Sequence, residues 1–225
     1  YTHMSNEGGQ VGSENWWKYS FGKEMKTDCE YVKKAFVWAY DVLQLCDRTD
    51  ISLIYNDYNT YDPKTTAQII ELINNINKVD DVNKVGKICA GIGMQSHVDI
   101  KRPTIEEYGA ALEKFMAAGY EVQITELDFT INFNTDGSNP SYDYKNEGET
   151  IEEQAAFVKD FMEMVIAKQK NRDKTVSPKG ITGLTIWGLY DSISWRGKSQ
   201  PLLFGTSIDD PKPAFQAFLE ASRTK

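Results

Sequence analysis

The sequence predicts an α/β fold in which a parallel β-sheet is covered by helices. Apolar runs short enough to be strands alternate with longer amphipathic segments along the chain. Strands whose apolar residues are nearly continuous are typical of parallel sheets that are buried on both faces. The chain has 225 residues, of which 40% are hydrophobic, so it can form a substantial core as a single domain.

Capping signals locate the helices. Thr27, Thr104 and Thr150 are each followed three residues later by Glu, a spacing that is typical of helix starts. Two further helices are predicted to begin at Pro63 and just after Pro213, because proline is tolerated in the first helical turn. The predicted helices cover residues 27–46, 63–76, 104–118 and 150–169, and a last one follows residue 213.

Four apolar runs are predicted to be strands, at residues 51–58, 90–98, 120–129 and 181–190. Their alternation with helices fits either a doubly wound sheet or part of a (β/α)8 barrel. A doubly wound sheet is expected to carry a glycine-rich phosphate loop after an early strand, and none of these runs is followed by one. Polar and aromatic residues stand at the strand ends instead, which favours the barrel.

The overall charge and the absence of long apolar runs exclude several functions. The formal net charge is −8, so the chain has no electrostatic reason to bind nucleic acid or an anionic membrane surface. No apolar run approaches the 18 residues of a membrane span, and the polar start of the chain does not resemble a signal peptide. Cys29, Cys46 and Cys89 are predicted to be buried free thiols. No cluster predicts a metal or another cofactor.

Two acids and a histidine at strand ends form the strongest candidate site. Glu126 and Asp128 are two residues apart, so they project to the same side of their strand. Two carboxylates inside a sheet are costly unless they serve a site. His97 ends the preceding strand, and neighbouring parallel strands lie about 4.8 Å apart, so it can reach Glu126. A solvated acid pair and a core histidine are the structural alternatives.

Trp187 and Trp195 flank a polar loop after the last strand. Indole rings stack on the apolar faces of sugars, and their N–H groups can donate to hydroxyls. Core packing is the alternative for either residue, although the polar Arg196-Gly197 that follows Trp195 argues against it there.

Five motifs in order resemble glycoside hydrolase family 10, the family of endo-β-1,4-xylanases. They extend the resemblance over residues 16–219. The motifs are YNDYN at 55–59, GIGMQSH at 91–97, ITELD at 124–128, IWG at 186–188 with SWRG at 194–197, and PLLF at 201–204 with PKPAF at 211–215.

The resemblance implies a retaining glycosidase in a (β/α)8 barrel, with two carboxyl groups about 5–5.5 Å apart flanking the scissile bond. It assigns Glu126 as the nucleophile, with His97 bonded to its carboxylate and Asp128 behind His97. Gln95, Trp187 and Trp195 match the walls of the sugar subsite. Asn56 and Tyr58 match positions that line the cleft near the leaving group. Xylan or xylo-oligosaccharides are the implied partners, and a secreted or cell-surface location follows.

The family barrel has eight strands, and the motifs found here match strands 5–8 and helices 4–8. Residues 1–225 are therefore expected to form the C-terminal half of a catalytic barrel, with residues 1–15 as the loop after the fourth strand. The general acid/base is expected upstream of Tyr1, with Glu7 as the less favoured candidate. The missing N-terminal half of the barrel is then an expected partner.

Two alternatives to a xylanase stay open. One is a non-catalytic xylan-binding fragment, and the other is a different retaining barrel glycosidase, which the GIGMQSH and SWRG motifs disfavour. The loop from Asn132 to Asp143 resembles the start of a calcium loop, but it lacks the usual end residues and a preceding helix. An ordinary Asp-Gly turn is the preferred interpretation.

Overall fold

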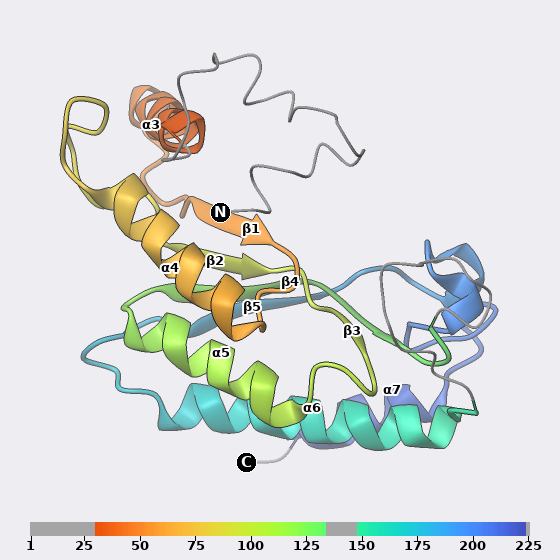
Figure 1. Ribbon diagram of the computed structural model, residues 1–225. Helices are drawn as coiled ribbons and strands as arrows, with labels where there is room; N and C mark the ends of the chain where they lie inside the picture. Colours follow the sequence, from red (N-terminus) through yellow and green to blue (C-terminus); the bar gives the residue numbers. More distant parts are fainter. Residues whose placement is uncertain (1–29, 134–147, 224–225) are drawn as a thin grey trace, which may run out of the picture. The chain divides into compact units, whose positions relative to one another are not determined.

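The computed structural model describes residues 30–133 and 148–223 (Figure 1). Loop 1–15, Thr27, Cys29 and most of the calcium-like loop lie outside these ranges. The chain divides into two compact units. The first comprises Tyr1–Tyr55 and Lys64–Gly91, and the second comprises Asn56–Pro63 and Ile92–Lys225. None of the helices in the described ranges is both long and apolar enough to cross a membrane.

The first unit is built around α3 (Glu30–Leu45) and α4 (Pro63–Asn77, from its second residue onward). The buried Lys33 donates from Nζ to the carbonyls of Asn75 and Lys78, both at 2.8 Å, and to the Asp80 carboxylate. The last carbonyls of a helix have no partner within the helix, so Lys33 satisfies groups at the end of α4. This contact joins the two helices of the unit.

Five strands form one sheet in the described chain: β1 (Ile54–Asp57), β2 (Gly91–Met94), β3 (His97–Asp99), β4 (Glu121–Thr130) and β5 (Ile181–Ile186). Their order is β1-β2-β4-β3, and β5 pairs with β4. The β3–β4 and β4–β5 pairs are parallel. The predicted α/β class with a parallel sheet is therefore confirmed.

The predicted strand 90–98 is wrong in detail, because it is two strands, β2 and β3. Ser96 lies between them with a φ of +67°, a left-handed conformation that interrupts a strand. Its hydroxyl donates to the carbonyl of Met94 at 2.9 Å and also lies against the Tyr108 hydroxyl. The break leaves β3 free to pair with β4 in its own register.

Two other predicted strands are shorter than expected. β1 begins at Ile54, and the exposed Ile51 lies before it. β5 ends at Ile186, shortly before Gly188. Gly188 has a φ of +144°, a backbone conformation that glycine adopts readily and other residues rarely adopt.

In the second unit, α5 (Ile105–Ala117) and α6 (Ile151–Asn171) run along one side of the sheet, with α7 (Pro213–Arg223) beside α6 (Figure 1). The capping boxes at Thr104 and Thr150 are confirmed, because each Thr and its partner Glu exchange hydrogen bonds with the backbone. Aromatic rings fill the core beneath the sheet, where Phe161 of α6 lies 4.7 Å from Tyr108 and 5.3 Å from Phe129 between ring centroids.

Beyond β5 the chain forms two short 3₁₀ turns, Asp191–Ile193 and Gly197–Ser199. A buried ion pair fixes this segment, with Lys212 Nζ 2.9 Å from Asp191 Oδ2. The other Asp191 oxygen accepts the backbone N–H of Leu202 at 2.7 Å. Burial raises the pKa of Asp191 and lowers that of Lys212, and their mutual attraction opposes both shifts. The segment that carries Trp195 is thus tied to the start of α7.

The cysteine prediction is partly wrong. Cys89 is a buried free thiol, as expected, but Cys46 is exposed. The reason is local, because α3 ends at Leu45 and Cys46 lies in the turn that follows.

Candidate active site

A histidine and two carboxylates lie together where β3 and β4 pair. His97 Nε2 is 3.3 Å from Glu126 Oε2, and His97 Nδ1 is 3.0 Å from Asp128 Oδ2. The parallel register sets His97 opposite Asp128, which explains how one imidazole can reach both acids. The Glu126 backbone N–H donates to the Gln95 carbonyl at 2.9 Å, so β2 and β4 are also held together at this point.

The two carboxylate partners of His97 limit where its ring can carry hydrogens. An ionised carboxylate can only accept hydrogen bonds, so bonding to Asp128 requires a hydrogen on Nδ1. Donation to both acids at once requires the imidazolium form. In either state the ring is held between the two carboxylates, with only 11% of its side chain exposed, against 16% for Glu126 and none for Asp128.

Asn56 holds the other oxygen of Glu126. Its Nδ2 donates to Glu126 Oε1 at 3.0 Å, and its Oδ1 accepts the Thr125 hydroxyl at 2.7 Å. Gly93 leaves room for this amide, because a Cβ at position 93 would stand 2.5 Å from Asn56 Oδ1. Both oxygens of Glu126 therefore have a partner, which fixes the plane of the carboxylate.

Asp128 is also held from the loop after β5. Trp195 Nε1 donates to Asp128 Oδ2 at 3.0 Å, the same oxygen that faces His97. The second oxygen, Oδ1, is buried and has no hydrogen-bond partner in the described ranges. Asp128 therefore positions two groups at once, the imidazole beside Glu126 and the indole of Trp195.

Two partly exposed indoles border this cluster. The Trp195 ring centroid lies 4.8 Å from that of His97, and the Trp187 centroid lies 6.4 Å from it. Trp195 is 59% exposed and Trp187 is 46% exposed, although both touch the cluster. The Trp187 indole N–H makes no hydrogen bond to any residue within 30–133 and 148–223. This combination of aromatic faces and a fixed carboxylate suits a sugar ring.

The comparisons with known proteins identify the family. The family model described as "Glycosyl hydrolase family 10" matches residues 4–221. The chain belongs to glycoside hydrolase family 10. The family fold is a (β/α)8 barrel, which confirms the predicted fold class, and the parallel sheet with its helices is a part of that barrel.

Individual family 10 proteins resemble the chain over most of its length. An "Endo-1,4-beta-xylanase A" of Butyrivibrio fibrisolvens is 36% identical over 207 residues, which are 91% of this chain and 42% of that protein. The xylanase structure from Cellvibrio japonicus superposes with a TM-score of 0.66 and 27% identity, covering 95% of this chain and 59% of the other. A Clostridium thermocellum xylanase structure gives a TM-score of 0.71 and 26% identity, covering 96% and 36%. The chain thus spans about half the length of such family 10 relatives.

The family 10 motifs account for most of the predicted site residues, and the structure brings five of them together: Asn56, His97, Glu126, Asp128 and Trp195. Trp187 lies at the edge of this group. The Gln95 backbone lies in the ladder beside Glu126, and its half-buried side chain makes no hydrogen bond within the described chain. Tyr58 follows the end of β1, where its backbone N–H donates to Asp57. Glu7 lies outside the described residues.

Sequence reasoning missed Thr125 and Arg196. Thr125 bonds to Asn56, and the Arg196 guanidinium lies over the Trp195 ring, 4.1 Å from its centroid. Arg196 follows Trp195 directly within a motif that was recognised, so its position in the chain was the available signal. Asn132, the first residue of the calcium-like loop, bonds to Glu149 through side chain and backbone.

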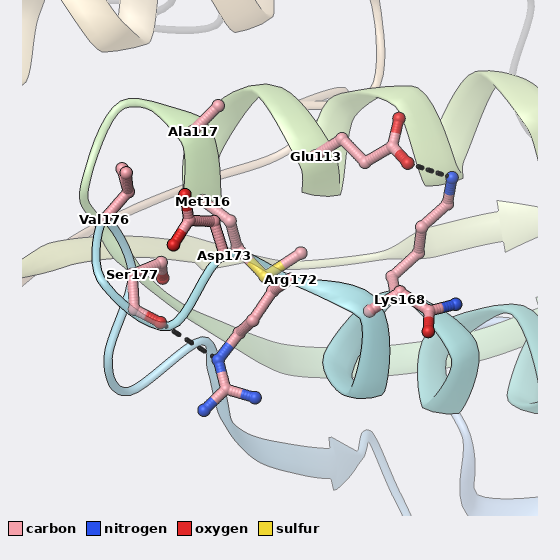
Figure 2. A pocket seen from close by; sticks show the side chains of 9 residues that line it. Glu113, Met116, Ala117, Lys168, Arg172, Asp173, Val176 and Ser177 are labelled. Atoms are coloured by element: carbon pink, nitrogen blue, oxygen red, sulfur yellow. Dashed lines mark hydrogen bonds and ion pairs between the residues drawn. The ribbon is translucent and has the colours of Figure 1, made fainter.

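A separate cavity of about 320 Å³ lies away from this site (Figure 2). It is formed by the last turns of α5 and α6 and by the segment that leads to β5. Its charged residues are already engaged, because Lys168 pairs with Glu113 and Arg172 donates to backbone carbonyls, including that of Ser177. The cavity lies near the amino ends of the strands, whereas barrel active sites lie at the carboxyl ends.

Proposed function

We propose that this chain provides the nucleophile and the sugar-binding wall of a retaining endo-β-1,4-xylanase. The observation that carries the proposal is the Glu126 carboxylate at the strand end, held on one oxygen by Asn56 and on the other by His97. The relative of Butyrivibrio fibrisolvens that is 36% identical is an endo-1,4-β-xylanase by name. The structure from Clostridium thermocellum was determined with xylohexaose.

In the proposed mechanism, Glu126 attacks the anomeric carbon and forms a covalent glycosyl-enzyme, which water then hydrolyses. Asn56 and His97 keep the carboxylate in the orientation that attack requires. Trp187, Trp195 and Gln95 bind the sugar that becomes attached. Asn56 and Tyr58 lie toward the leaving group.

The reaction also needs a carboxylic acid that protonates the leaving oxygen. Asp128 does not fit that role, because it is fully buried behind His97 and bonded to Trp195. We propose that the acid/base comes from outside the described residues, from a complementary half of the barrel in preference to Glu7. Xylan is too large to enter a cell, so we further propose that the protein acts outside the cell or on its surface.

A xylan-binding protein without catalysis is the second candidate. The observation that favours it is that no suitable general acid lies among the described residues. Assaying xylan hydrolysis by the chain together with the amino-terminal half of a family 10 barrel separates the two. Hydrolysis in the mixture supports the enzyme. Binding of xylo-oligosaccharides without hydrolysis in that mixture supports the binding protein.

The role of Glu126 is tested by Glu126→Ala in the hydrolytic assembly. We expect turnover to fall by several orders of magnitude while binding survives, because each factor of ten corresponds to about 1.4 kcal/mol of lost transition-state stabilisation. Azide should partly restore cleavage of an aryl β-xylobioside and yield the α-azide, because it enters from the side that Glu126 occupied. The exposed acid Glu152 provides the control, as Glu152→Ala. Full activity of Glu126→Ala would remove the nucleophile assignment.

A further inference from the structure

The Arg196 guanidinium lies over two aromatic rings. Its guanidinium carbon lies 4.1 Å from the centroid of the Trp195 ring and 4.4 Å from that of Phe133. The attraction of a guanidinium to an aromatic ring uses its charge and does not engage its five N–H donors in hydrogen bonds. The two ring contacts therefore hold the Arg196 side chain without a side-chain hydrogen bond to any described residue.

The Arg196 donors are unpaired within the part of the chain that the structure describes. The charge of Arg196 acts on Asp99, whose carboxylate accepts instead from the Thr130 hydroxyl at 2.8 Å and from the backbone N–H of Lys101 at 3.0 Å. No ion pair links Arg196 to Asp99 or to any other acid in residues 30–133 and 148–223. A half-buried arginine whose side chain makes no hydrogen bond to any described residue keeps its N–H donors for a further acceptor.

The position of Arg196 indicates what the acceptor is. The residue stacks on the indole that, under the proposed function, forms the wall of the sugar subsite. A group that accepts from the guanidinium N–H donors is therefore attached to, or adjacent to, a bound sugar. A planar fork of N–H donors matches a carboxylate in bidentate geometry better than it matches a hydroxyl. The protein itself carries a net charge of −8, so a positive charge in contact with the Trp195 ring is a specific feature.

We propose that Arg196 binds the carboxylate of an acidic branch on the xylan chain, such as a glucuronic acid substituent. Arg196 then determines specificity, because it favours decorated over unbranched substrate. The proposal rests on the proposed function, since it needs a xylose chain on the Trp195 platform. A purely structural role, in which Arg196 only supports the Trp195 ring, predicts equal effects of its removal on acidic and neutral ligands.

The test is equilibrium binding of two xylo-oligosaccharides with the same backbone, one bearing a single glucuronic acid branch and one unbranched. Calorimetry on the full chain gives the ratio of the two affinities. We expect the wild type to bind the acidic ligand about tenfold more tightly, as one charged hydrogen-bonded pair allows, and added salt to reduce that preference. Arg196→Gln should abolish the preference, and Arg196→Lys should retain only part of it, because lysine keeps the charge but not the fork.

Lys198→Gln is the matched control, since it removes one positive charge from the same segment and should leave the ratio unchanged. An unchanged ratio in Arg196→Gln, or an equal loss for both ligands, would overturn the proposal. Free glucuronic acid distinguishes a general anion site. If free glucuronic acid binds as tightly as the branched oligosaccharide, the xylose chain does not contribute to recognition of the carboxylate, and the proposal fails. A wild type that binds neither oligosaccharide would instead refute the proposed function itself.

Discussion

The indole N–H of Trp195 offers a direct measure of how strongly the buried acid behind the site depends on its partners. Trp195→Phe keeps an aromatic ring at this position but removes the donor that reaches Asp128 Oδ2 at 3.0 Å. Asp128 has no exposed side-chain surface, and its Oδ1 already lacks a partner in the described ranges. The variant would leave His97 as the one side-chain donor to Asp128 Oδ2 among the described residues.

The magnitude follows from this arrangement. A hydrogen bond to a charged group contributes about 1.5–3 kcal/mol, and removing one partner of a buried group exposes that cost directly. We therefore expect Trp195→Phe to lower the free energy of unfolding by about 2 kcal/mol. Urea unfolding followed by far-ultraviolet circular dichroism measures the change without relying on tryptophan fluorescence.

Trp187→Phe is the matched control for this experiment. Trp187 is similarly exposed and also lies against His97, but its N–H has no hydrogen-bond partner in the described chain. Its replacement should change the free energy of unfolding by no more than about 0.5 kcal/mol. Equal losses in the two variants would show that ring packing and not the bond to Asp128 accounts for the effect, and our reasoning about Asp128 would be wrong.

Two further predictions concern buried charges outside the Glu126 cluster. Burial raises the pKa of Asp99 from its ordinary value of 3.8 to about 6, and the charge of Glu149 adds to the shift. Between these two pH values the Asp99 carboxyl is protonated in the folded protein and ionised in the unfolded chain. The free energy of unfolding should therefore fall as pH rises from about 4 to about 6. Asp99→Asn should remove up to about 3 kcal/mol of that loss, measured by urea unfolding at pH 4.5 and pH 7.5. Identical pH dependence in the variant would contradict the assignment of the loss to Asp99. Lys212→Met leaves Asp191 buried without its cation, so it should lower the free energy of unfolding by about 3–5 kcal/mol. Adding Asp191→Leu should recover much of this loss, because it removes the uncompensated charge. No recovery in the double variant would argue against an uncompensated charge as the cause.

The sequence predicted the parts of the fold that depend on local chemistry. The capping boxes at Thr104 and Thr150 appear as expected, because the Thr and Glu side chains satisfy backbone groups only a few residues away. The break at Ser96 was not predicted, since the hydroxyl of this left-handed residue lies against the Tyr108 hydroxyl from α5. The local sequence pattern does not indicate which distant residue will contact Ser96 in the folded protein.

The candidate site shows the same division. The spacing of Glu126 and Asp128 and the position of His97 on the preceding strand were sufficient to predict that the three side chains meet. The contacts of Thr125 and Arg196 were not predictable in this way. Thr125 meets Asn56 from a part of the chain almost seventy residues away, and the Arg196 guanidinium lies over the ring of Phe133, which is also distant in sequence. Both depend on how separate segments pack, and no spacing rule specifies that.

The geometry around Asp128 explains how the exposed Trp195 ring, the proposed sugar platform, can keep a defined orientation without a ligand. Trp195 is 59% exposed, so packing alone does not restrain it strongly, and a mobile indole would lose conformational freedom on binding. The bond to Asp128 fixes one edge of the ring and the stack with Arg196 covers one face. The same carboxylate orients His97 against Glu126. Under the proposed function, a change that disturbs the Asp128 carboxylate is therefore expected to affect sugar binding and the orientation of Glu126 together. A change at Asn56 affects Glu126 directly, without involving Trp195.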